Sequence, residues 1–484
     1  MSVTKDHTTY DNYVGGEWVG SADRVPNTNP SDVSDVVGLY AHGSADDVGT
    51  AVDAAREALP GWASAGVQSR FDVLDAVGTR IRERADELAT LLAREEGKPV
   101  GEARGEVLRA AQLFKFFAGE AIRNTGELVE STRPGLTVEM TREPVGVVGV
   151  ITPWNFPIAI PAWKIAPALA FGNTVVMKPA EVAPGCSWEL VSMLAEAGLP
   201  PGVLNLVMGS GREVGDAIVR SSGIDAVTFT GSAAVGHQVA VAAAEAGTRV
   251  QCEMGGKNPL VVLGDADLHV AVQAAVNGAF YSTGQRCTAS SRFVVTEDVH
   301  DEFVERLHKA MGQLRVGHAL EAGTVIGPVV NDRQLSQDLR YIDLAREEGG
   351  EVFGGSRVER PTEGYFLEPA LVTGTTPEMT INREEVFGPV ASAQKVADYD
   401  EALAIANDTL FGLSAGICSQ SLRHVQHFKR NVQAGMVMVN APTAGVDYHV
   451  SFGGRRGSSY GQREQGRAAR EFYTVHKTTY VDAG

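Results

Sequence analysis

The chain has 484 residues, 44% of them hydrophobic and 21% charged, so it is long and apolar enough for two or three folded domains with large cores. Its formal net charge of −18 argues against a nucleic-acid partner, because neutralising phosphates requires clustered lysine and arginine. The first 20 residues contain no apolar run behind a basic flank, so no secretory signal is predicted.

The most apolar stretch, residues 145–177, is interrupted by several prolines and by Asn155 and Lys164. A membrane span of ~20 apolar residues does not fit that pattern, so we expect no membrane partner. The cysteines are widely spaced without a Cys-x-x-Cys pair, which argues against a disulfide framework. We therefore expect a reduced, cytoplasmic protein, and we assign no metal site. The cysteines are Cys186, Cys252, Cys287 and Cys418.

Residues 45–120 are predicted to be helical. Asp46 is the expected N-cap of a helix over Val48–Leu59, and Gln68–Glu95 has the amphipathic pattern of one long helix. Alternating threonine and valine around residues 125–144 then indicates strands.

From residue 145 onward, short apolar strands alternate with helices, which predicts an α/β fold with a parallel, doubly wound sheet that binds ligands at the carboxyl ends of its strands. The first strands are expected at Gly146–Ile151, Asn173–Lys178, Val203–Met208, Ala226–Phe229 and Arg249–Glu253, and their helices at Ala159–Ala170, Ser187–Ala197, Arg212–Ser221 and Ala233–Ala246. A second series has strands at Pro259–Leu263, Ser291–Val295 and Met436–Val439 and helices at Leu268–Tyr281, His300–Met311 and Tyr399–Ala406. Phe353–Pro369 is predicted to be a surface hairpin or loop, and Arg470–Val481 an edge strand.

Residues suited to covalent oxidation of an aldehyde lie in three short segments, Thr152–Pro157, Glu253–Lys257 and Thr283–Thr288. That reaction needs a thiolate to attack the carbonyl, donors for the resulting oxyanion, a hydride acceptor, and a base that delivers water to the thioester. Cys287 supplies the sulfur and Glu253 is the candidate base. The Asn155 side-chain amide and the backbone N–H of Cys287 are the candidate oxyanion donors.

The order Asn155, Glu253, Cys287, with the last two 34 positions apart, resembles the aldehyde dehydrogenase superfamily. Further matching segments cover nearly the whole chain. They are Lys178–Glu181, Phe229–Ser232, Glu385–Pro389 and Phe452–Gly454.

The resemblance implies three parts. A Rossmann-like parallel-sheet NAD-binding domain would comprise residues 1–123 and 145–255, and a second α/β catalytic domain residues 256–454. A small β oligomerisation element would comprise residues 124–144 and 455–484. Unpaired edge strands invite pairing with another subunit, so we expect a homo-oligomer, either a dimer or a tetramer.

The resemblance also implies a cofactor site. Lys178 and Glu181 would contact the adenosine ribose, and Gly231 and Ser232 the pyrophosphate at a helix N-terminus. Glu385 would hold the nicotinamide ribose. A carboxylate at Glu181 would repel a 2′-phosphate, so NAD is favoured and NADP remains possible. Lys178 is also expected to be one of the catalytic residues. The remaining cofactor residues implied are Ile151, Thr152, Pro153, Trp154, Ala180, Gly211, Phe229, Thr230 and Phe387.

Glu253 also separates two kinds of product. Superfamily members that transfer the acyl group to coenzyme A typically lack this glutamate, so its presence implies hydrolysis to a free acid.

Within the superfamily, residues 157–164, 282–291 and 442–448 resemble bacterial 2-oxoglutarate semialdehyde (2,5-dioxovalerate) dehydrogenases. An acid substrate favours an arginine near the pocket, for which Arg286 beside the nucleophile is one candidate. A partly aromatic funnel is expected from Phe156, Trp163, Tyr448 and Phe452. This aromatic funnel would equally suit neutral or aromatic aldehydes, so a broad-specificity enzyme is the alternative. Ser451 stands where the family usually has proline, which leaves the geometry of the loop at the pocket mouth open. The residues expected to contact substrate are Asn155, Phe156, Trp163, Arg286, Thr288, Tyr448 and Phe452.

A non-catalytic binding protein on the same fold is the alternative from another class. Considered alone, Cys287 would be a small buried hydrophobic residue. Its combination with Asn155 and Glu253 favours the enzyme. Cys252 keeps the structural interpretation, because strand alternation points it to the face opposite Glu253.

Overall fold

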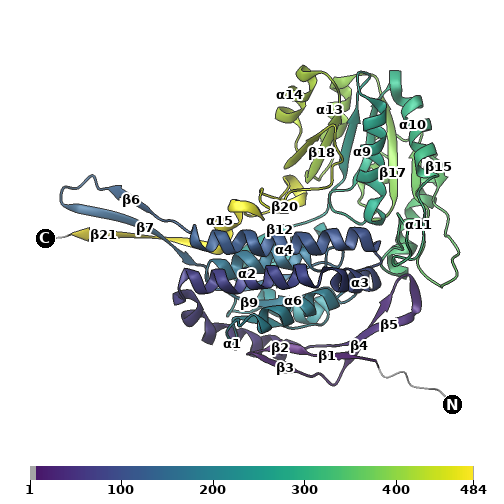
Figure 1. Ribbon diagram of the computed structural model, residues 1–484. Coiled ribbons are helices and arrows are strands. Elements are labelled where there is room, and N and C mark those ends of the chain that lie inside the picture. Colours follow the sequence, from purple (N-terminus) through teal and green to yellow (C-terminus); the bar gives the residue numbers. More distant parts are fainter. Residues whose placement is uncertain (1–6, 483–484) are drawn as a thin grey trace, which may run out of the picture.

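The computed structural model describes residues 7–482, and two large sheets organise it (Figure 1). In Figure 1 the first sheet lies in the half that carries the long helices α2 and α4, and the second sheet lies above it. The mixed α/β architecture with parallel sheets confirms the expected fold class. None of the helices in the described residues is long and apolar enough to cross a bilayer.

Four helices precede the parallel core, as expected, but two details of the prediction are wrong. Ser44, not Asp46, is the first N-cap: its hydroxyl accepts from the Asp47 N–H, and the Asp47 carboxylate accepts from the Ser44 N–H. The helix predicted over Gln68–Glu95 is two helices, because the backbone of Arg84 leaves the helical conformation. The helices are α1 (Ala45–Ser64), α2 (Val67–Glu83), α3 (Ala85–Glu96) and α4 (Val100–Ile122).

The first sheet has eight strands in the order β20-β12-β11-β8-β9-β10-β2-β3. Its parallel core starts in the middle at β8, runs outward through β9 and β10, and then crosses to β11 and β12 on the other side. This reversal makes the carboxyl ends of β8 and β11 the expected ligand site. The strands are β2 (Asn12–Val14), β3 (Glu17–Val19), β8 (Val147–Ile151), β9 (Thr174–Lys178), β10 (Leu204–Leu206), β11 (Ala226–Thr230), β12 (Arg249–Glu253) and β20 (Ser459–Tyr460).

Helices connect these strands close to the predicted positions. The helix predicted over Arg212–Ser221 begins with a π turn, η1 (Gly211–Gly215), and continues as a short α-helix. The helices are α5 (Ala159–Ala170), α6 (Gly185–Glu196), α7 (Asp216–Arg220) and α8 (Ala233–Glu245).

The second sheet has seven strands in the order β15-β16-β17-β14-β13-β18-β19, parallel except for β15. The strands are β13 (Asn258–Val262), β14 (Ser290–Thr296), β15 (Glu351–Gly354), β16 (Ala370–Thr373), β17 (Val390–Val396), β18 (Ser414–Cys418) and β19 (Met436–Val439). The accompanying helices are α9 (Leu268–Phe280), α10 (Glu297–Met311), α11 (Asp332–Glu347), α12 (Thr380–Arg383), α13 (Tyr399–Asn407) and α14 (Leu422–Asn431).

Two small sheets complete the fold. β6 (Glu127–Glu130), β7 (Leu136–Pro144) and β21 (Thr474–Asp482) form an antiparallel sheet that projects from the body in Figure 1, and β21 follows the short helix α15 (Arg470–Tyr473). β1 (Thr9–Tyr10), β5 (Asp32–Ala41) and β4 (Arg24–Asn29) form the other.

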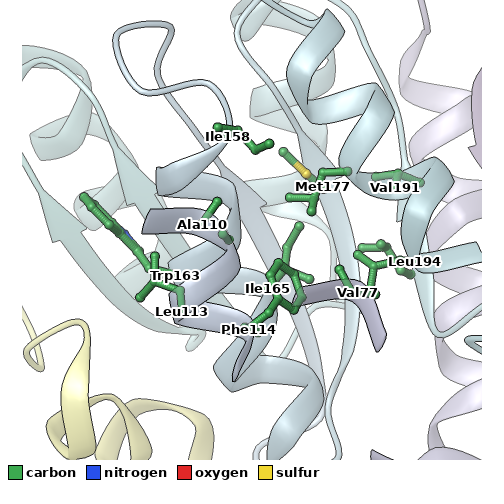
Figure 2. Close-up of a cluster of buried hydrophobic side chains, with 14 of the residues drawn as sticks. Val77, Ala110, Leu113, Phe114, Ile158, Trp163, Ile165, Met177, Val191 and Leu194 are labelled. Carbon is green, nitrogen blue, oxygen red and sulfur yellow. The ribbon is translucent and has the colours of Figure 1, made fainter. Parts of the chain in front are cut away.

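The main core lies between the first sheet and helices α2, α4 and α5. Every residue of α5 is buried, so this helix is apolar all round, as a helix enclosed by protein on all sides must be. Figure 2 shows Ile165 of α5 packed with Phe114 of α4 and Val77 of α2. The core thus fixes α4 and α5 relative to the strand ends, and both helices contribute side chains to the site described next.

Candidate active site

The carboxyl ends of the parallel strands gather several of the predicted residues. Ile151 ends β8, Lys178 ends β9, Thr230 ends β11 and Glu253 ends β12. Because these strands are adjacent and parallel, their ends share one edge of the sheet. The loop after β8 then carries Asn155 over this edge.

Cys287 comes from the other half of the molecule, in the loop between η2 (Tyr281–Gly284) and β14. Asn258, at the start of β13, positions this loop by donating from Nδ2 to the carbonyls of Cys287 (2.8 Å) and Ala289 (2.9 Å). Gly284 has a φ of +66°, and a Cβ there would lie 2.1 Å from the carbonyl oxygen of Gly388, so only glycine fits. The loop is therefore a constrained turn.

The Cys287 thiol is half-buried in an apolar and negatively charged setting. Burial raises its pKa to about 12, and the carboxylates of Glu385 and Glu253 add to the rise. Backbone hydrogen bonds act in the opposite direction. These effects favour the neutral thiol over the reactive thiolate.

Asn155 reaches the same loop from the first half. Its Nδ2 donates to the carbonyl of Gln285 at 2.9 Å, directly before the nucleophile turn. A carboxamide has two N–H donors, so one remains to serve as an oxyanion donor. The structure thus brings Asn155 and the Cys287 loop together, as expected.

Glu253 is buried, with the Ser459 hydroxyl donating to Oε2 at 2.6 Å. Oε1 has no hydrogen-bond partner within residues 7–482. Burial raises the pKa of Glu253 well above its usual range, and the charge of Glu464 adds to this rise. The adjacent Cys252 packs into the apolar layer on the other face of the strand, as predicted from alternation.

Two buried lysine–glutamate pairs flank these residues, and sequence reasoning missed both. Lys164 on α5 contacts Glu464, whose Oε1 also accepts from Gln251 at 3.2 Å. On the other side, Lys98 donates to Glu106 at 2.6 Å and to the backbone carbonyl of Asn155 at 2.7 Å.

The Lys98 pair also holds the loop that follows Asn155. The second oxygen of Glu106 accepts from the N–H groups of Ile158 and Ala159, both at 3.2 Å. The Lys98 ammonium lies 4.1 Å from the centroid of the Phe156 ring. Phe156 therefore packs on this cation in a partly buried position.

The carboxylate of Glu385 packs against the backbone of Gly255 and Gly256. Its Oε1 accepts from the Gly256 N–H at 2.9 Å, and a Cβ at Gly255 would lie 1.9 Å from its Oε2. Burial raises the pKa of Glu385 to about 7. Phe387, whose φ of +67° is unusual for a non-glycine residue, packs edge-on against Trp154 with ring centroids 5.5 Å apart. These two rings join the two halves of the molecule near Glu385.

The strand edge also has features that fit a dinucleotide. The N-terminus of α8 is open to solvent and capped by Ser232, which suits an anion. The hydroxyls of Thr152 and Thr230 are buried without hydrogen-bond partners in the described part of the chain. Burial lowers the pKa of Lys178 to about 8, and Nζ donates to the Pro179 carbonyl at 2.8 Å.

The exposed carboxylate of Glu181 and the exposed Gly211 lie at the outer part of this edge, with Ala180 half-buried beside Glu181. Pro153 is half-buried in the loop after β8, and Phe229 is buried in β11. The ring of Phe229 also explains Gly231, since a Cβ there would lie 2.5 Å from it. The predicted cofactor residues of the first half thus lie along the carboxyl edge of its sheet, whereas Glu385 and Phe387 come from the second half.

Two of the aromatic residues predicted to contact substrate meet beside the nucleophile. The rings of Trp163 and Phe452 lie 5.3 Å apart, and Cys287 packs against the small apolar cluster that contains Phe452. Tyr448 packs more distantly, on Phe116 of α4.

The structure does not bring the side chain of Arg286 into this group. Its guanidinium contacts the carbonyls of Asn277 and Gly278 in the last turn of α9, which is a structural role. The backbone carbonyl of Thr288 accepts from the Thr443 hydroxyl at 2.7 Å, so this residue helps to fix the same loop.

A thiol, a carboxamide and a buried carboxylate therefore converge beside a strand edge suited to a dinucleotide, which defines a thiol-dependent, nucleotide-linked oxidoreductase. The sequence profile described as the aldehyde dehydrogenase family matches residues 18–479. The chain belongs to this family and is an NAD(P)-dependent aldehyde dehydrogenase.

Named relatives agree with this assignment. The chain is 44% identical to alpha-ketoglutaric semialdehyde dehydrogenase of Bacillus subtilis, over 99% of this chain and 100% of the relative. It is 46% identical to alpha-ketoglutarate semialdehyde dehydrogenase of Haloferax volcanii, over 97% and 98%. The resemblance noted in the sequence is confirmed.

Solved structures agree in fold. Betaine aldehyde dehydrogenase from Staphylococcus aureus, crystallised with NAD+, superposes with a TM-score of 0.96 at 33% identity, covering 99% of this chain and 96% of that one. An NADP-dependent enzyme from Escherichia coli gives a TM-score of 0.95 at 33% identity, covering 98% of each chain.

Proposed function

We propose that the chain oxidises 2-oxoglutarate semialdehyde, or a similar short semialdehyde, to the free carboxylic acid. The names of the relatives from Bacillus subtilis and Haloferax volcanii support this substrate. The single observation that carries the choice of product is Glu253, a buried carboxylate with one oxygen free to accept a proton from water.

In this mechanism, the Cys287 thiol gives its proton to water and its sulfur attacks the aldehyde carbon, forming the oxyanion of a thiohemiacetal. The free N–H of Asn155 and the backbone N–H of Cys287 stabilise the oxyanion, and loss of one such donor typically lowers the rate by about 10²–10³. When bound, the oxidised nicotinamide supplies the hydride acceptor. The carbon attached to Cys287 then becomes a thioester.

Hydrolysis follows at the same carbon. Glu253 takes a proton from water through Oε1, and the hydroxide attacks the thioester. The acid is released, and the Cys287 sulfur takes the proton back from Glu253. The hydrogen bond from Ser459 keeps Oε2 fixed, so that Oε1 is left for water. Asn155, Cys287 and Glu253 thus each have one role.

For the cofactor we propose NAD as the preferred form. The residues that would hold it are Lys178 and Glu181 at the adenosine ribose, Gly231 and Ser232 at the pyrophosphate, and Glu385 at the nicotinamide ribose. The exposed carboxylate of Glu181 supports NAD, because it would repel a 2′-phosphate.

The proposed hydrolysis is tested by Glu253→Gln. We expect a burst of reduced cofactor equal to the active sites, followed by turnover lowered about 10²–10⁴-fold, because the thioester forms but water is not activated. Rapid mixing with absorbance of the reduced nicotinamide measures both phases. Undiminished steady-state turnover removes Glu253 from the mechanism.

The substrate is tested by kcat/KM across short semialdehydes and aromatic aldehydes with both cofactors. A preference for 2-oxoglutarate semialdehyde is expected. Equal values for neutral and aromatic aldehydes would favour a broad-specificity enzyme, the second candidate, for which the rings of Trp163 and Phe452 are the supporting observation.

We also propose that the chain works in the cytoplasm as a homodimer or homotetramer, with residues 124–144 and 455–484 as the oligomerisation element. The exposed apolar side chains of Leu128 on β6 and Tyr480 and Val481 on β21 support this, since such strands are protected by pairing. The four described cysteines are free, as expected in a reducing compartment. Sedimentation showing only monomer would contradict the assembly.

A further inference from the structure

Three buried hydrogen-bond donors without partners lie beside the aromatic funnel. Nη2 of Arg109 on α4 donates to Oε1 of Gln465 at 3.1 Å, and its Cζ lies 5.9 Å from the Trp163 ring centroid. Within residues 7–482, Arg109 Nε, Trp163 Nε1 and Gln465 Nε2 all lack a hydrogen-bond partner. Buried donors are normally satisfied, so three unsatisfied ones in neighbouring residues indicate a place for a bound acceptor.

The guanidinium is also without a matching charge. Among the carboxylates whose charge acts on Arg109, Glu106 is already paired with Lys98, and Asp447 is exposed. Neither forms an ion pair with Arg109 in the described part of the chain. A half-buried cation without a paired charge is stabilised by an anionic ligand.

The position of these donors relates them to the reacting thiol. Trp163 stacks obliquely on Phe452, and Cys287 packs on the cluster containing Phe452. A negative charge on the Cys287 sulfur would raise the pKa of Arg109, so the two groups are close enough to interact electrostatically. Figure 2 shows Trp163 at the margin of the buried core, with its ring directed away from Ile165 and Phe114.

The backbone at Gln465 supports a specific placement of its amide. Its φ is +57°, in the left-handed region that costs a non-glycine residue free energy. The side chain is completely buried. Such a conformation persists only where the surrounding structure holds the residue in place.

We propose that Arg109, Gln465 and Trp163 form the subsite for the acid end of the substrate, with the aldehyde end at Cys287. The planar guanidinium would bind the carboxylate, and the free N–H groups of Gln465 and Trp163 would donate to the carboxylate or the adjoining 2-oxo oxygen. This inference rests on the proposed function and deepens it. It assigns to Arg109 the role that the sequence suggested for Arg286.

The test compares Arg109→Met with Arg104→Met, a substitution on the same helix at an exposed arginine that pairs with Asp86. For Arg109→Met, the ratio of kcat/KM for 2-oxoglutarate semialdehyde to that for pentanal is expected to fall roughly 10- to 100-fold, since a charged hydrogen bond is lost. Arg104→Met is expected to keep the wild-type ratio. Arg109→Lys keeps the positive charge but not the planar guanidinium, so its kcat/KM ratio should lie between those of the other two variants.

Calorimetric titration with 2-oxoglutarate, the product, provides a readout independent of turnover. Wild type is expected to bind it, and Arg109→Met and Gln465→Leu to bind it at least roughly 10-fold more weakly. A wild-type preference for the semialdehyde that survives in Arg109→Met overturns the subsite but leaves the proposed function intact. If the wild type does not prefer the semialdehyde, the proposed function is removed. If, in addition, the affinity for 2-oxoglutarate is the same in wild type and Arg109→Met, the subsite is overturned too, and ordered water is the occupant of these donors.

Discussion

The two buried lysine–glutamate pairs differ in how completely their hydrogen bonds are satisfied. In the pair Lys98–Glu106, both carboxylate oxygens have partners, and the ammonium also binds the Asn155 carbonyl. In the pair Lys164–Glu464, Oε1 of Glu464 is shared among several donors, whereas Oε2 has none among the described residues.

This difference separates a rigid support from a pair whose carboxylate acts on the proposed base through its charge. A buried ion pair is stable only where the remaining lone pairs and protons are satisfied, as they are around Glu106. That pair fixes the backbone of the Asn155 loop. The second pair is incomplete and lies where its carboxylate raises the pKa of the proposed base Glu253, so it influences chemistry more than geometry.

Breaking the satisfied pair should have the largest effect. Lys98→Met leaves Glu106 buried without its cation and frees the Asn155 carbonyl, so we expect the free energy of unfolding to fall by about 3–5 kcal/mol. Urea unfolding measures this change. Adding Glu106→Gln should restore part of the stability, because the buried charge is removed, but kcat should stay low while the Asn155 loop is unsupported. A stability change below about 1 kcal/mol would mean that the pair is not a support.

Breaking the incomplete pair should have a smaller effect on stability and a distinct effect on pH dependence. Glu464→Gln is expected to lower the free energy of unfolding by about 1–3 kcal/mol. It also removes a negative charge that raises the pKa of Glu253, while Lys164 remains.

The sign of the pH effect follows from the role of Glu253, which acts as a base only when it is ionised. A lower pKa therefore moves the rising limb of kcat against pH to lower pH. Steady-state rates across the pH range measure this limb. A limb that stays in place, or moves to higher pH, would contradict the electrostatic role assigned to Glu464.

Breaking an exposed ion pair should have the smallest effect on the free energy of unfolding. Arg220 and Asp216 are four residues apart on α7 and more than half exposed, with 2.9 Å between Nε and Oδ1. Arg220→Ala should change the free energy of unfolding by no more than about 0.5 kcal/mol. A larger loss in urea unfolding would show that burial is not what distinguishes these pairs.

The sequence predicted those features that depend on neighbouring residues. α5 and β12 have the predicted bounds because hydrophobicity and strand length are local. Arg84 divides the helix predicted over Gln68–Glu95, and its guanidinium binds Glu189 on α6, a contact that no local pattern contains. The cap at Ser44 had a local signal, the aspartate three residues later, which could have corrected the choice of Asp46.

The candidate site likewise contains residues that local sequence segments predicted and residues that they did not. Cys287, Glu253 and Asn155 were found because they lie in short segments whose spacing is recognisable. Lys98 lies in the loop between α3 and α4, and Arg109 lies on α4, neither within a recognisable motif. Their partners are distant: Asn155 is 57 residues from Lys98, and Gln465 is 356 residues from Arg109. Only the tertiary structure makes these contacts visible.

The pairing of β20 with β12 has a consequence for biosynthesis. Ser459, in β20, is the hydrogen-bond donor to Glu253, 206 residues earlier in the chain, and Glu464 meets Lys164 across 300 residues. Domains fold largely as they leave the ribosome, with the N-terminal parts first. The surroundings of the proposed base are therefore completed only after residues 459–464 have been translated, and a nascent chain that ends before them should remain catalytically silent.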